Sequence, residues 1–144
     1  RLFSLPMERK MRALRSSAGV AGYGLPPISL LFPKSMWCEG FTVAGSPAED
    51  AGKLWPDDSE RFCEVTESYQ NHMKCVGEQV LSLILGYLGI SDRKMCSVSG
   101  GALRQPSAVL QLNSYLSGPE PGRAMGLASH TDTSLLTILH QSGD

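Results

Sequence analysis

The residues best suited to carry out chemistry are His130 and Asp132, which flank Thr131 near the end of the sequence. On an extended strand, residues i and i+2 point to the same side and lie roughly 6.5–7 Å apart. An imidazole and a carboxylate placed in this way can bind one metal ion. They would supply two of the three ligands of the two-histidine-one-carboxylate set, which suits non-haem Fe(II). The pattern alone also fits a hydrogen-bonded pair on the protein surface.

Asn113 and Tyr115 form a second pair with the same spacing. Their amide and phenol groups can donate hydrogen bonds to a carboxylate or keto oxygen of a ligand. A turn expected over residues 118–122 could bring this pair close to His130. The alternative is that Tyr115 is a core aromatic residue and Asn113 caps the end of a strand.

Both pairs lie where apolar and polar residues alternate with a period of two. This period predicts strands over residues 108–115, 123–131 and 135–141. Residues 118–122, which read Gly-Pro-Glu-Pro-Gly, separate the first strand from the second. The predicted strands would therefore carry all four candidate residues.

A long helix is predicted upstream, over residues 57–88. Asp57, Asp58 and Ser59 suit a helix start, and Gly86 and Gly89 suit its end. Apolar side chains recur every three or four residues, and we expect this stripe to pack in a protein core. The stripe consists of Phe62, Val65, Tyr69, Met73, Val76, Val80, Leu83 and Tyr87.

The N-terminal part combines a short basic helix with an irregular region. Residues 6–16 predict the helix, with Pro6 in its first turn. Residues 17–56 are rich in glycine and proline, which punctuate short extended pieces such as 28–32 and 40–43. Aromatic residues scattered through this region indicate a packed connection rather than a flexible linker.

Composition excludes several classes of partner. The 144 residues include 13 Lys+Arg and 14 Asp+Glu, so a net charge of −1 gives no general reason to bind nucleic acid or a membrane surface. No apolar run approaches the roughly 20 residues that span a bilayer. The four cysteines lack zinc-site spacing. Because no secretory leader is visible, we expect free thiols and a cytoplasmic location, with two disulfides as the alternative.

Residues 110–141 read LQLNSYLSGPEPGRAMGLASHTDTSLLTILHQ. This segment resembles the start of the double-stranded β-helix in plant 2-oxoglutarate/Fe(II)-dependent dioxygenases, where N-x-Y and a proline-rich turn precede H-x-D and an apolar strand. The upstream segments SLPMERKMRA, GVAGYG, FPKSMWCEGFTVAGSPAED and KLWPDDSERFCEV resemble one branch of that superfamily, the gibberellin 3-beta-dioxygenases. The resemblance extends from Phe3 to Gln141.

The resemblance implies an α+β fold in three parts. Residues 1–56 would be a partial N-terminal dioxygenase region, and residues 57–90 a long backing helix. Residues 105–144 would be the first strands of a double-stranded β-helix (jelly roll) that is truncated here. The sequence begins with Arg1 rather than Met, which also suggests a piece of a longer protein.

The resemblance also implies roles for the four candidate residues. His130 and Asp132 would be iron ligands, and Asn113 and Tyr115 would help to hold 2-oxoglutarate. The family's third ligand, a distal His, and its Arg-x-Ser pair are not found at matching positions in these 144 residues. The Arg-x-Ser at residues 15–17 lies outside the expected barrel. We expect the other two histidines not to be ligands, because His72 lies within the predicted helix and His140 is ordinary strand content.

The implied reaction is hydroxylation of a gibberellin precursor at the 3-beta position, with Fe(II), 2-oxoglutarate and O₂, and with ascorbate as a further candidate cofactor. Oxidative decarboxylation of 2-oxoglutarate would yield succinate and CO₂. The protein would act as a monomer on a small molecule, with no nucleic-acid or membrane partner. We expect no turnover from residues 1–144 alone. The alternatives are another plant 2-oxoglutarate dioxygenase (gibberellin 20- or 2-oxidation, another hormone or a secondary metabolite) and a catalytically inactive binding module.

Overall fold

The structure is a computed structural model that describes residues 2–24, 36–90, 107–116 and 125–141. The extended piece expected at 28–32, the turn at 118–122 and Cys96 lie outside the described residues. The chain divides into two units, each described by itself. The first comprises residues 1–67 and 109–131, and the second comprises residues 68–108 and 132–144.

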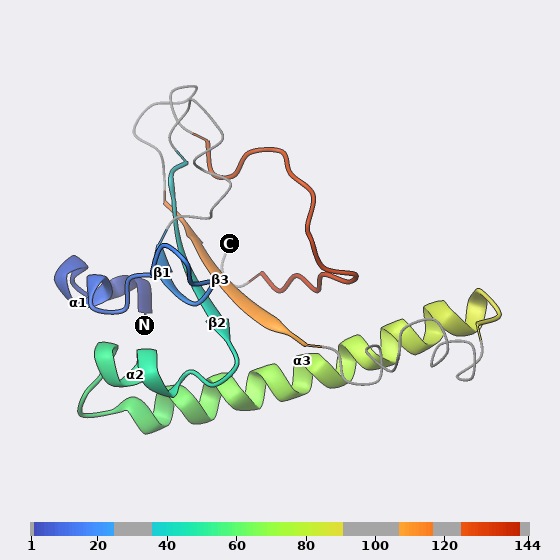
Figure 1. Cartoon of the computed structure of the whole chain (residues 1–144), viewed down its shortest axis with the longest axis horizontal. Helices are drawn as coiled ribbons and strands as arrows, with labels where there is room; N and C mark the ends of the chain where they lie inside the picture. Colours follow the sequence, from blue (N-terminus) through green and yellow to red (C-terminus); the bar gives the residue numbers. More distant parts are fainter. Residues whose placement is uncertain (1, 25–35, 91–106, 117–124, 142–144) are drawn as a thin grey trace. The chain divides into compact units, whose positions relative to one another are not determined.

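Within the first unit, the described strands form one antiparallel sheet in the order β1–β2–β3 (Figure 1). The strands span Gly22–Gly24 (β1), Cys38–Ala44 (β2) and Val109–Tyr115 (β3). The central strand β2 pairs with β3 along its whole length, from Cys38 opposite Tyr115 to Ala44 opposite Val109. The strand predicted over residues 108–115 is therefore confirmed.

The core of this unit lies on one face of the sheet. Phe41 is fully buried there, and its ring meets the ring of Phe62 edge-on at 6.4 Å. The Trp55 ring lies tilted by 32° against Phe62, with 4.6 Å between the ring centres. The core also contains residues from the N-terminal segment, from β1 to β3 and from the helix α2 (Ala48–Leu54), among them Leu2, Ala13, Tyr23, Val43, Leu54, Leu110 and Leu112.

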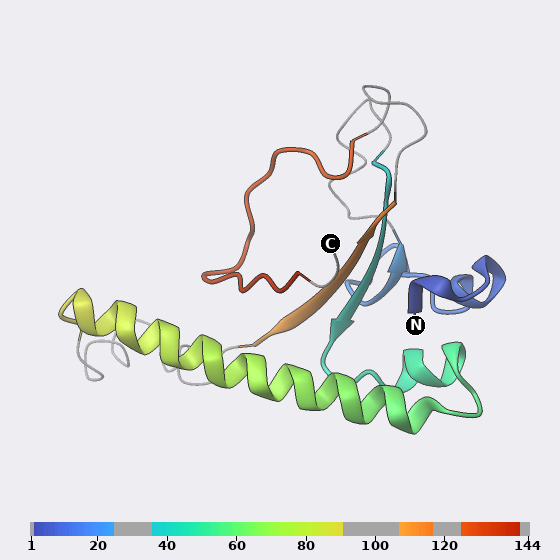
Figure 2. The same cartoon turned by 180° about the vertical axis from the view of Figure 1, so that it is seen from behind.

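The N-terminal helix is shorter than predicted. A 3-10 turn, η1, spans Leu2–Ser4, and α1 spans Met7–Met11 rather than residues 6–16. The helix ends because the next backbone groups pair with β1: Tyr23 N donates to Ala13 O at 2.7 Å, and Arg15 N donates to Tyr23 O at 2.9 Å. This pairing holds the chain beside the edge strand β1 (Figure 2).

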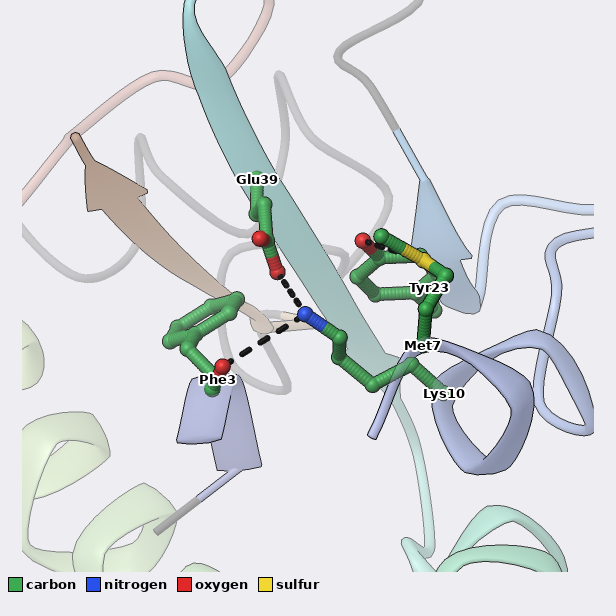
Figure 3. Close-up of polar contacts among 5 residues, drawn as sticks. All are labelled: Phe3, Met7, Lys10, Tyr23 and Glu39. Carbon is green, nitrogen blue, oxygen red and sulfur yellow. Dashed lines mark hydrogen bonds and ion pairs between the residues drawn. The ribbon is translucent and has the colours of Figure 1, made fainter. Parts of the chain in front are cut away.

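A buried ion pair ties α1 to β2 (Figure 3). The Nζ of Lys10 lies 2.5 Å from the Oε2 of Glu39, and it also donates to the carbonyl of Phe3 at 3.4 Å. Lys10 is only 4% exposed and lies 5.4 Å from the centre of the Tyr23 ring. Burial, followed by the nearby Glu39 carboxylate, raises the pKa of Tyr23 to about 12. Because of this pKa the phenol is protonated at neutral pH, and its hydroxyl donates to the sulfur of Met7 at 3.6 Å.

The long predicted helix is confirmed as α3, Ser59–Tyr87. Its end is a glycine cap: Gly89 adopts a φ of 66° and its N–H donates to Gly86 O at 3.1 Å. The next N–H, from Ile90, donates to Leu85 O at 2.9 Å. This pair of bonds is a Schellman motif, in which the glycine takes the left-handed conformation that other residues resist. Gly86 itself stays inside the helix.

The expectation that the apolar stripe of α3 packs in a core is wrong for much of its length. Phe62 joins the core of the first unit, but Val65, Leu83 and Tyr87 are 64%, 75% and 92% exposed. Among the described residues of α3, Thr66 is the one that is buried. A helical stripe is buried only where another layer covers it, and the described residues cover the stripe of α3 only in part.

The strands predicted over residues 123–131 and 135–141 are absent from the described residues. Met125 makes a single bridge with Met36, and residues 126–141 contain no strand. Alternation favours a strand, but a strand forms only where a neighbour completes its hydrogen-bond ladder. Leu135 and Leu139 are accordingly exposed. The described residues thus combine helices with an antiparallel sheet, in agreement with an α+β fold, and the jelly roll stays a prediction.

The thiol prediction agrees with the described cysteines, since Cys38, Cys63 and Cys75 are all free. In the part of the chain that the structure describes, no helix has both the length and the apolar character needed to cross a membrane.

Candidate functional site

Asn113 and Tyr115 project from the same face of β3, as their spacing predicts. Burial alternates along this strand, with Leu110 and Leu112 turned toward the core and Asn113 and Tyr115 exposed. In the register of the sheet, Asn113 lies opposite Gly40 and Tyr115 lies opposite Cys38. The two candidate residues therefore lie on the face of the sheet that points away from this core. We call it the open face, because Asn113 and Tyr115 are exposed on it.

A row of hydrogen bonds crosses this open face and ends at Asn113. Arg15 Nη2 donates to Thr42 Oγ1 at 2.7 Å. The Thr42 hydroxyl donates to Gln111 Oε1, and Gln111 Nε2 donates to Asn113 Oδ1 at 3.0 Å. We call Arg15, Thr42, Gln111 and Asn113 the polar row. It joins the N-terminal segment to β2 and β3.

Tyr115 lies beside the segment that leads to His130. A Cβ atom added to Gly126 would lie 3.1 Å from the Tyr115 ring, so a glycine allows the two to pack closely. Burial, followed by the neighbouring Cys38, raises the pKa of Tyr115, and burial raises the pKa of the Cys38 thiol. Both groups are therefore protonated at neutral pH, and the Tyr115 hydroxyl can act as a hydrogen-bond donor.

A small second cluster fixes the segment before His130. Met36, Cys38 and Ala128 are buried together, with Met125 and Leu127 packed against them. The backbone N–H of Trp37 donates to Met125 O at 2.7 Å. This cluster places residues 125–128 against the start of β2, next to the end of β3 that carries Tyr115.

The environment of His130 selects one tautomer of its ring. Nδ1 lies 2.8 Å from the carbonyl oxygen of Ala128. A carbonyl only accepts hydrogen bonds, so Nδ1 carries the hydrogen in the neutral ring and Nε2 carries the lone pair. Metal-binding histidines commonly donate their second ring nitrogen to a backbone carbonyl in this way. The geometry of His130 therefore fits a metal ligand that binds through Nε2.

Asp132 belongs to the second unit, because the boundary between the units falls between Thr131 and Asp132. Its Oδ2 accepts a hydrogen bond from Thr137 Oγ1 at 2.6 Å, and Thr137 in turn lies 3.0 Å from the Ser134 hydroxyl. This hydrogen bond orients the carboxylate of Asp132. The side chain also fits a metal ligand.

Imidazole and carboxylate are both donors that Fe(II) accepts. Among the described residues, no group of three or more His, Cys, Asp or Glu side chains is placed to hold a metal ion. The other two histidines are engaged elsewhere: His72 Nδ1 lies 2.7 Å from Ser68 O within α3, and His140 stacks on Tyr69. His140 is not on a strand, which corrects the interpretation of it as strand content.

Several residues that organise these side chains were missed by sequence reasoning. Thr42 and Gln111 support Asn113, and Thr137 supports Asp132. Gln111 carried a signal, since it shares a strand face with Asn113 and Tyr115 at i, i+2 and i+4. Thr42 and Thr137 carried none, because single hydroxyl residues are common in strands and loops.

The chain is similar to known proteins over nearly its whole length, although no family model matches it. It is 48% identical over 143 residues to gibberellin 3-beta-dioxygenase 1 of Arabidopsis thaliana, which covers 98% of this chain and 40% of that protein. Gibberellin 3-beta-dioxygenase 1 of Pisum sativum is 47% identical over 142 residues, covering 98% of this chain and 38% of the relative. Gibberellin 3-beta-dioxygenase 2-3 of Triticum aestivum is 39% identical over 149 residues, covering 98% and 40%.

The chain spans about two fifths of the length of these curated relatives. The candidate residues of the open sheet face and of the His130–Asp132 segment all fall inside the similar region, which leaves out only 2% of this chain. Over 98% of their length, these 144 residues are similar in sequence to gibberellin 3-beta-dioxygenases of Arabidopsis thaliana, Pisum sativum and Triticum aestivum.

Proposed function

We propose that the protein to which this chain belongs is a 2-oxoglutarate- and Fe(II)-dependent dioxygenase that hydroxylates a gibberellin precursor at the 3-beta position. The observation that carries the proposal is the similarity of the whole chain to gibberellin 3-beta-dioxygenases at 39–48% identity. The contact of His130 Nδ1 with the carbonyl of Ala128 also supports it, because metal-binding histidines commonly make such a contact through their second ring nitrogen.

In this proposal His130 and Asp132 hold Fe(II), and Asn113 and Tyr115 help to hold 2-oxoglutarate. Bound Fe(II) supplies, together with 2-oxoglutarate and O₂, the oxidising power that hydroxylates an unactivated carbon. The chain's own residues orient the reactants: Ala128 sets the ring of His130, and Thr137 sets the carboxylate of Asp132. The protonated hydroxyl of Tyr115 donates a hydrogen bond to an oxygen of the co-substrate.

The proposal extends to the organisation of the longer protein. Residues 1–56 are part of an N-terminal region, residues 57–90 are a backing helix, and residues 105–144 begin a jelly-roll barrel. Closure of this barrel by further strands would pair the edge of β3 and order residues 126–141 as strands. A third iron ligand, a histidine, and an Arg-x-Ser pair for the far carboxylate of 2-oxoglutarate would come from the rest of the protein.

We further propose that the protein is a cytoplasmic monomer whose partners are a small gibberellin and O₂, with no nucleic-acid or membrane partner. Ascorbate would act as an additional cofactor by keeping iron reduced. The free thiols at Cys38, Cys63 and Cys75 agree with a reducing compartment.

The decisive experiment supplies the full-length protein with Fe(II), 2-oxoglutarate and gibberellin precursors and identifies the products by mass spectrometry. We expect a 3-beta-hydroxylated gibberellin and succinate in equal amounts. Hydroxylation at carbon 2 or oxidation at carbon 20 would assign the protein to another dioxygenase branch. Absence of any 2-oxoglutarate turnover would favour the catalytically inactive binding module.

The ligand roles are tested by His130→Ala and Asp132→Ala, with His72→Ala as the matched control. Loss of an outer-shell partner of a metal costs roughly 10- to 100-fold in activity or metal affinity, and loss of a ligand costs at least as much. We therefore expect both ligand variants to lose turnover by more than 100-fold, and the His72 variant to keep wild-type activity because His72 lies exposed on α3. Retained turnover in the His130 variant would remove it from the metal site.

A further inference from the structure

The hydrogen bonds of the polar row all donate in one direction, from Arg15 toward Asn113, and Arg15 sets that direction. Arg15 has only N–H donors, so Thr42 Oγ1 must accept where the two meet at 2.7 Å. The Thr42 hydroxyl hydrogen is then donated to Gln111 Oε1. Because the oxygen of the Gln111 amide faces Thr42, its NH₂ group faces the other way, toward Asn113.

A separate contact fixes the Gln111 amide in the same orientation. Gln111 Nε2 lies 3.4 Å from the backbone carbonyl of Leu112 and 3.0 Å from Asn113 Oδ1. A backbone carbonyl only accepts hydrogen bonds, so the nitrogen end of the amide must lie on that side. The Arg15 guanidinium can only donate and the Leu112 carbonyl can only accept hydrogen bonds. Both therefore require the same orientation of the Gln111 amide.

The direction of the row determines what Asn113 presents on the open face. Its Oδ1 accepts from Gln111, so the two N–H donors of its amide remain for a ligand. Hydrogen bonds linked in one direction from a cation polarise one another, which strengthens the final donor. Carboxylate and keto oxygens are acceptors and match this donor end.

Gly40 of β2 has no side chain, and this leaves space for the contact between the Gln111 and Asn113 side chains. A Cβ atom at Gly40 would lie 3.0 Å from Gln111 Nε2, 3.6 Å from Asn113 Oδ1 and 2.8 Å from the carbonyl oxygen of Gly24. The contact between the Gln111 and Asn113 side chains therefore lies over a position where only glycine fits without displacement. Gly40 is directly opposite Asn113 in the register, so the gap is built into the pairing of β2 with β3.

We infer that Arg15, Thr42 and Gln111 are positioning residues that hold the Asn113 amide with its N–H groups toward a bound 2-oxo acid. The inference rests on the proposed function for the identity of the ligand, 2-oxoglutarate. The orientation of the amide rests on the structure alone.

The sharpest variant is Gln111→Glu, which keeps the length of an exposed side chain and removes its donors. The new carboxylate accepts from Thr42 and also from Asn113, so the Asn113 amide turns over and presents its oxygen to the ligand. Val109→Glu is the matched control, because it adds the same charge to the same exposed face of β3, four residues before Asn113. Thr42→Val breaks the row without adding charge, and Thr42→Ser restores the hydroxyl.

Two measurements on the full-length protein separate the inference from the proposed function. The first records the side-chain NH₂ signals of Asn113 by ¹⁵N NMR without ligand. The second titrates 2-oxoglutarate calorimetrically into the Fe(II)-loaded protein without O₂. We expect the Asn113 signals to move in Gln111→Glu and Thr42→Val and to return in Thr42→Ser. The Kd for 2-oxoglutarate should rise roughly 10- to 100-fold in the first two variants only, in line with loss of a hydrogen bond to a charged group.

Unmoved Asn113 signals in both variants would overturn the inference, as would a Kd within about twofold of wild type in both. An equal loss of affinity in Val109→Glu would also overturn it, because charge alone would then explain the effect. If Thr42→Val does not fold, Gln111→Glu at its exposed position decides the outcome. If the wild-type protein binds no 2-oxoglutarate, the proposed function fails, and the NMR signals alone decide whether the row holds the amide.

Discussion

The two faces of the three-stranded sheet in the described residues use the same strands for different purposes. On one face Phe41 of β2 and Leu112 of β3 lie opposite each other and are covered by Phe62. On the other face Asn113 and Tyr115 are exposed and belong to the candidate site. Because strand side chains alternate, the core residue Leu112 and the candidate residue Asn113 are neighbours in sequence on β3. Packing of the core face therefore also fixes the backbone that carries the candidate residues.

Each face also receives one cation from the N-terminal segment, and the two cations are used differently. Lys10 is buried on the core side, where the carboxylate of Glu39 neutralises it. Arg15 reaches the open face and donates to the neutral hydroxyl of Thr42. The ion pair holds α1 against β2, whereas the hydrogen bond from Arg15 begins the polar row that ends at Asn113.

The largest difference between the faces should appear in Phe41→Ala. Removing a fully buried aromatic side chain costs about 3–5 kcal/mol of the free energy of unfolding, through lost burial and a residual cavity. Gln111→Ala on the open face should cost about 1 kcal/mol or less. Urea unfolding of both variants measures the contrast, and equal losses would mean that the two faces are equally packed.

Breaking the buried ion pair should have the next largest effect. Lys10→Met leaves the partly buried Glu39 carboxylate without this partner, which costs up to about 3 kcal/mol. The double variant Lys10→Met/Glu39→Leu should recover most of this loss, because a well-packed apolar pair of similar volume replaces the charges. Urea unfolding again provides the measurement. A double variant as unstable as the single one would show that packing, not charge, explains the loss.

Gly40→Ala tests the narrow gap beneath the polar row. Its Cβ atom would meet the carbonyl oxygen of Gly24 at 2.8 Å, so β1 must shift, and overpacking of this kind costs about 1–3 kcal/mol. Gly52→Ala is the control, because nothing lies within 4 Å of its Cβ position and alanine favours the helix α2 by up to about 1 kcal/mol. Thermal unfolding should therefore shift in opposite directions for the two variants.

The last and smallest expected effect is a loss of stability at alkaline pH, when Tyr23 on the core face ionises. Burial, followed by the Glu39 carboxylate, raises the pKa of Tyr23 from 10.0 to about 12. Between these values the native state binds more protons than the unfolded state, so stability contributed by Tyr23 is present below pH 10 and falls as the pH rises toward 12. Tyr23→Phe should make that fall shallower, and unfolding measured from pH 9 to 12 checks it. Parallel curves for the two proteins would contradict this prediction.

The sequence predicted correctly the features that depend on neighbouring residues, and it failed for features that depend on contacts with distant parts of the chain. The helix α3 and the strand β3 follow from periodicity, a start at Ser59 and a stop at Gly89, which act within a few residues. The same reasoning failed for the strands predicted over residues 123–131 and 135–141, because the described residues 126–141 contain no strand. Burial of the α3 stripe failed for a related reason, because periodicity shows which face is apolar but not whether another layer covers it.

The sequence by itself determined that Asn113 and Tyr115 share a face, because both lie on the strand β3 at i and i+2. It predicted the same for His130 and Asp132, but the described residues 126–141 contain no strand. It also determined the similarity to gibberellin 3-beta-dioxygenases. Only the tertiary structure decided how Asn113 is turned and which nitrogen of His130 carries the hydrogen. The orientation of Asn113 depends on Arg15 and Thr42, which are far away in sequence, while the His130 tautomer depends on the fold of a loop. Local patterns of residue types do not encode either contact.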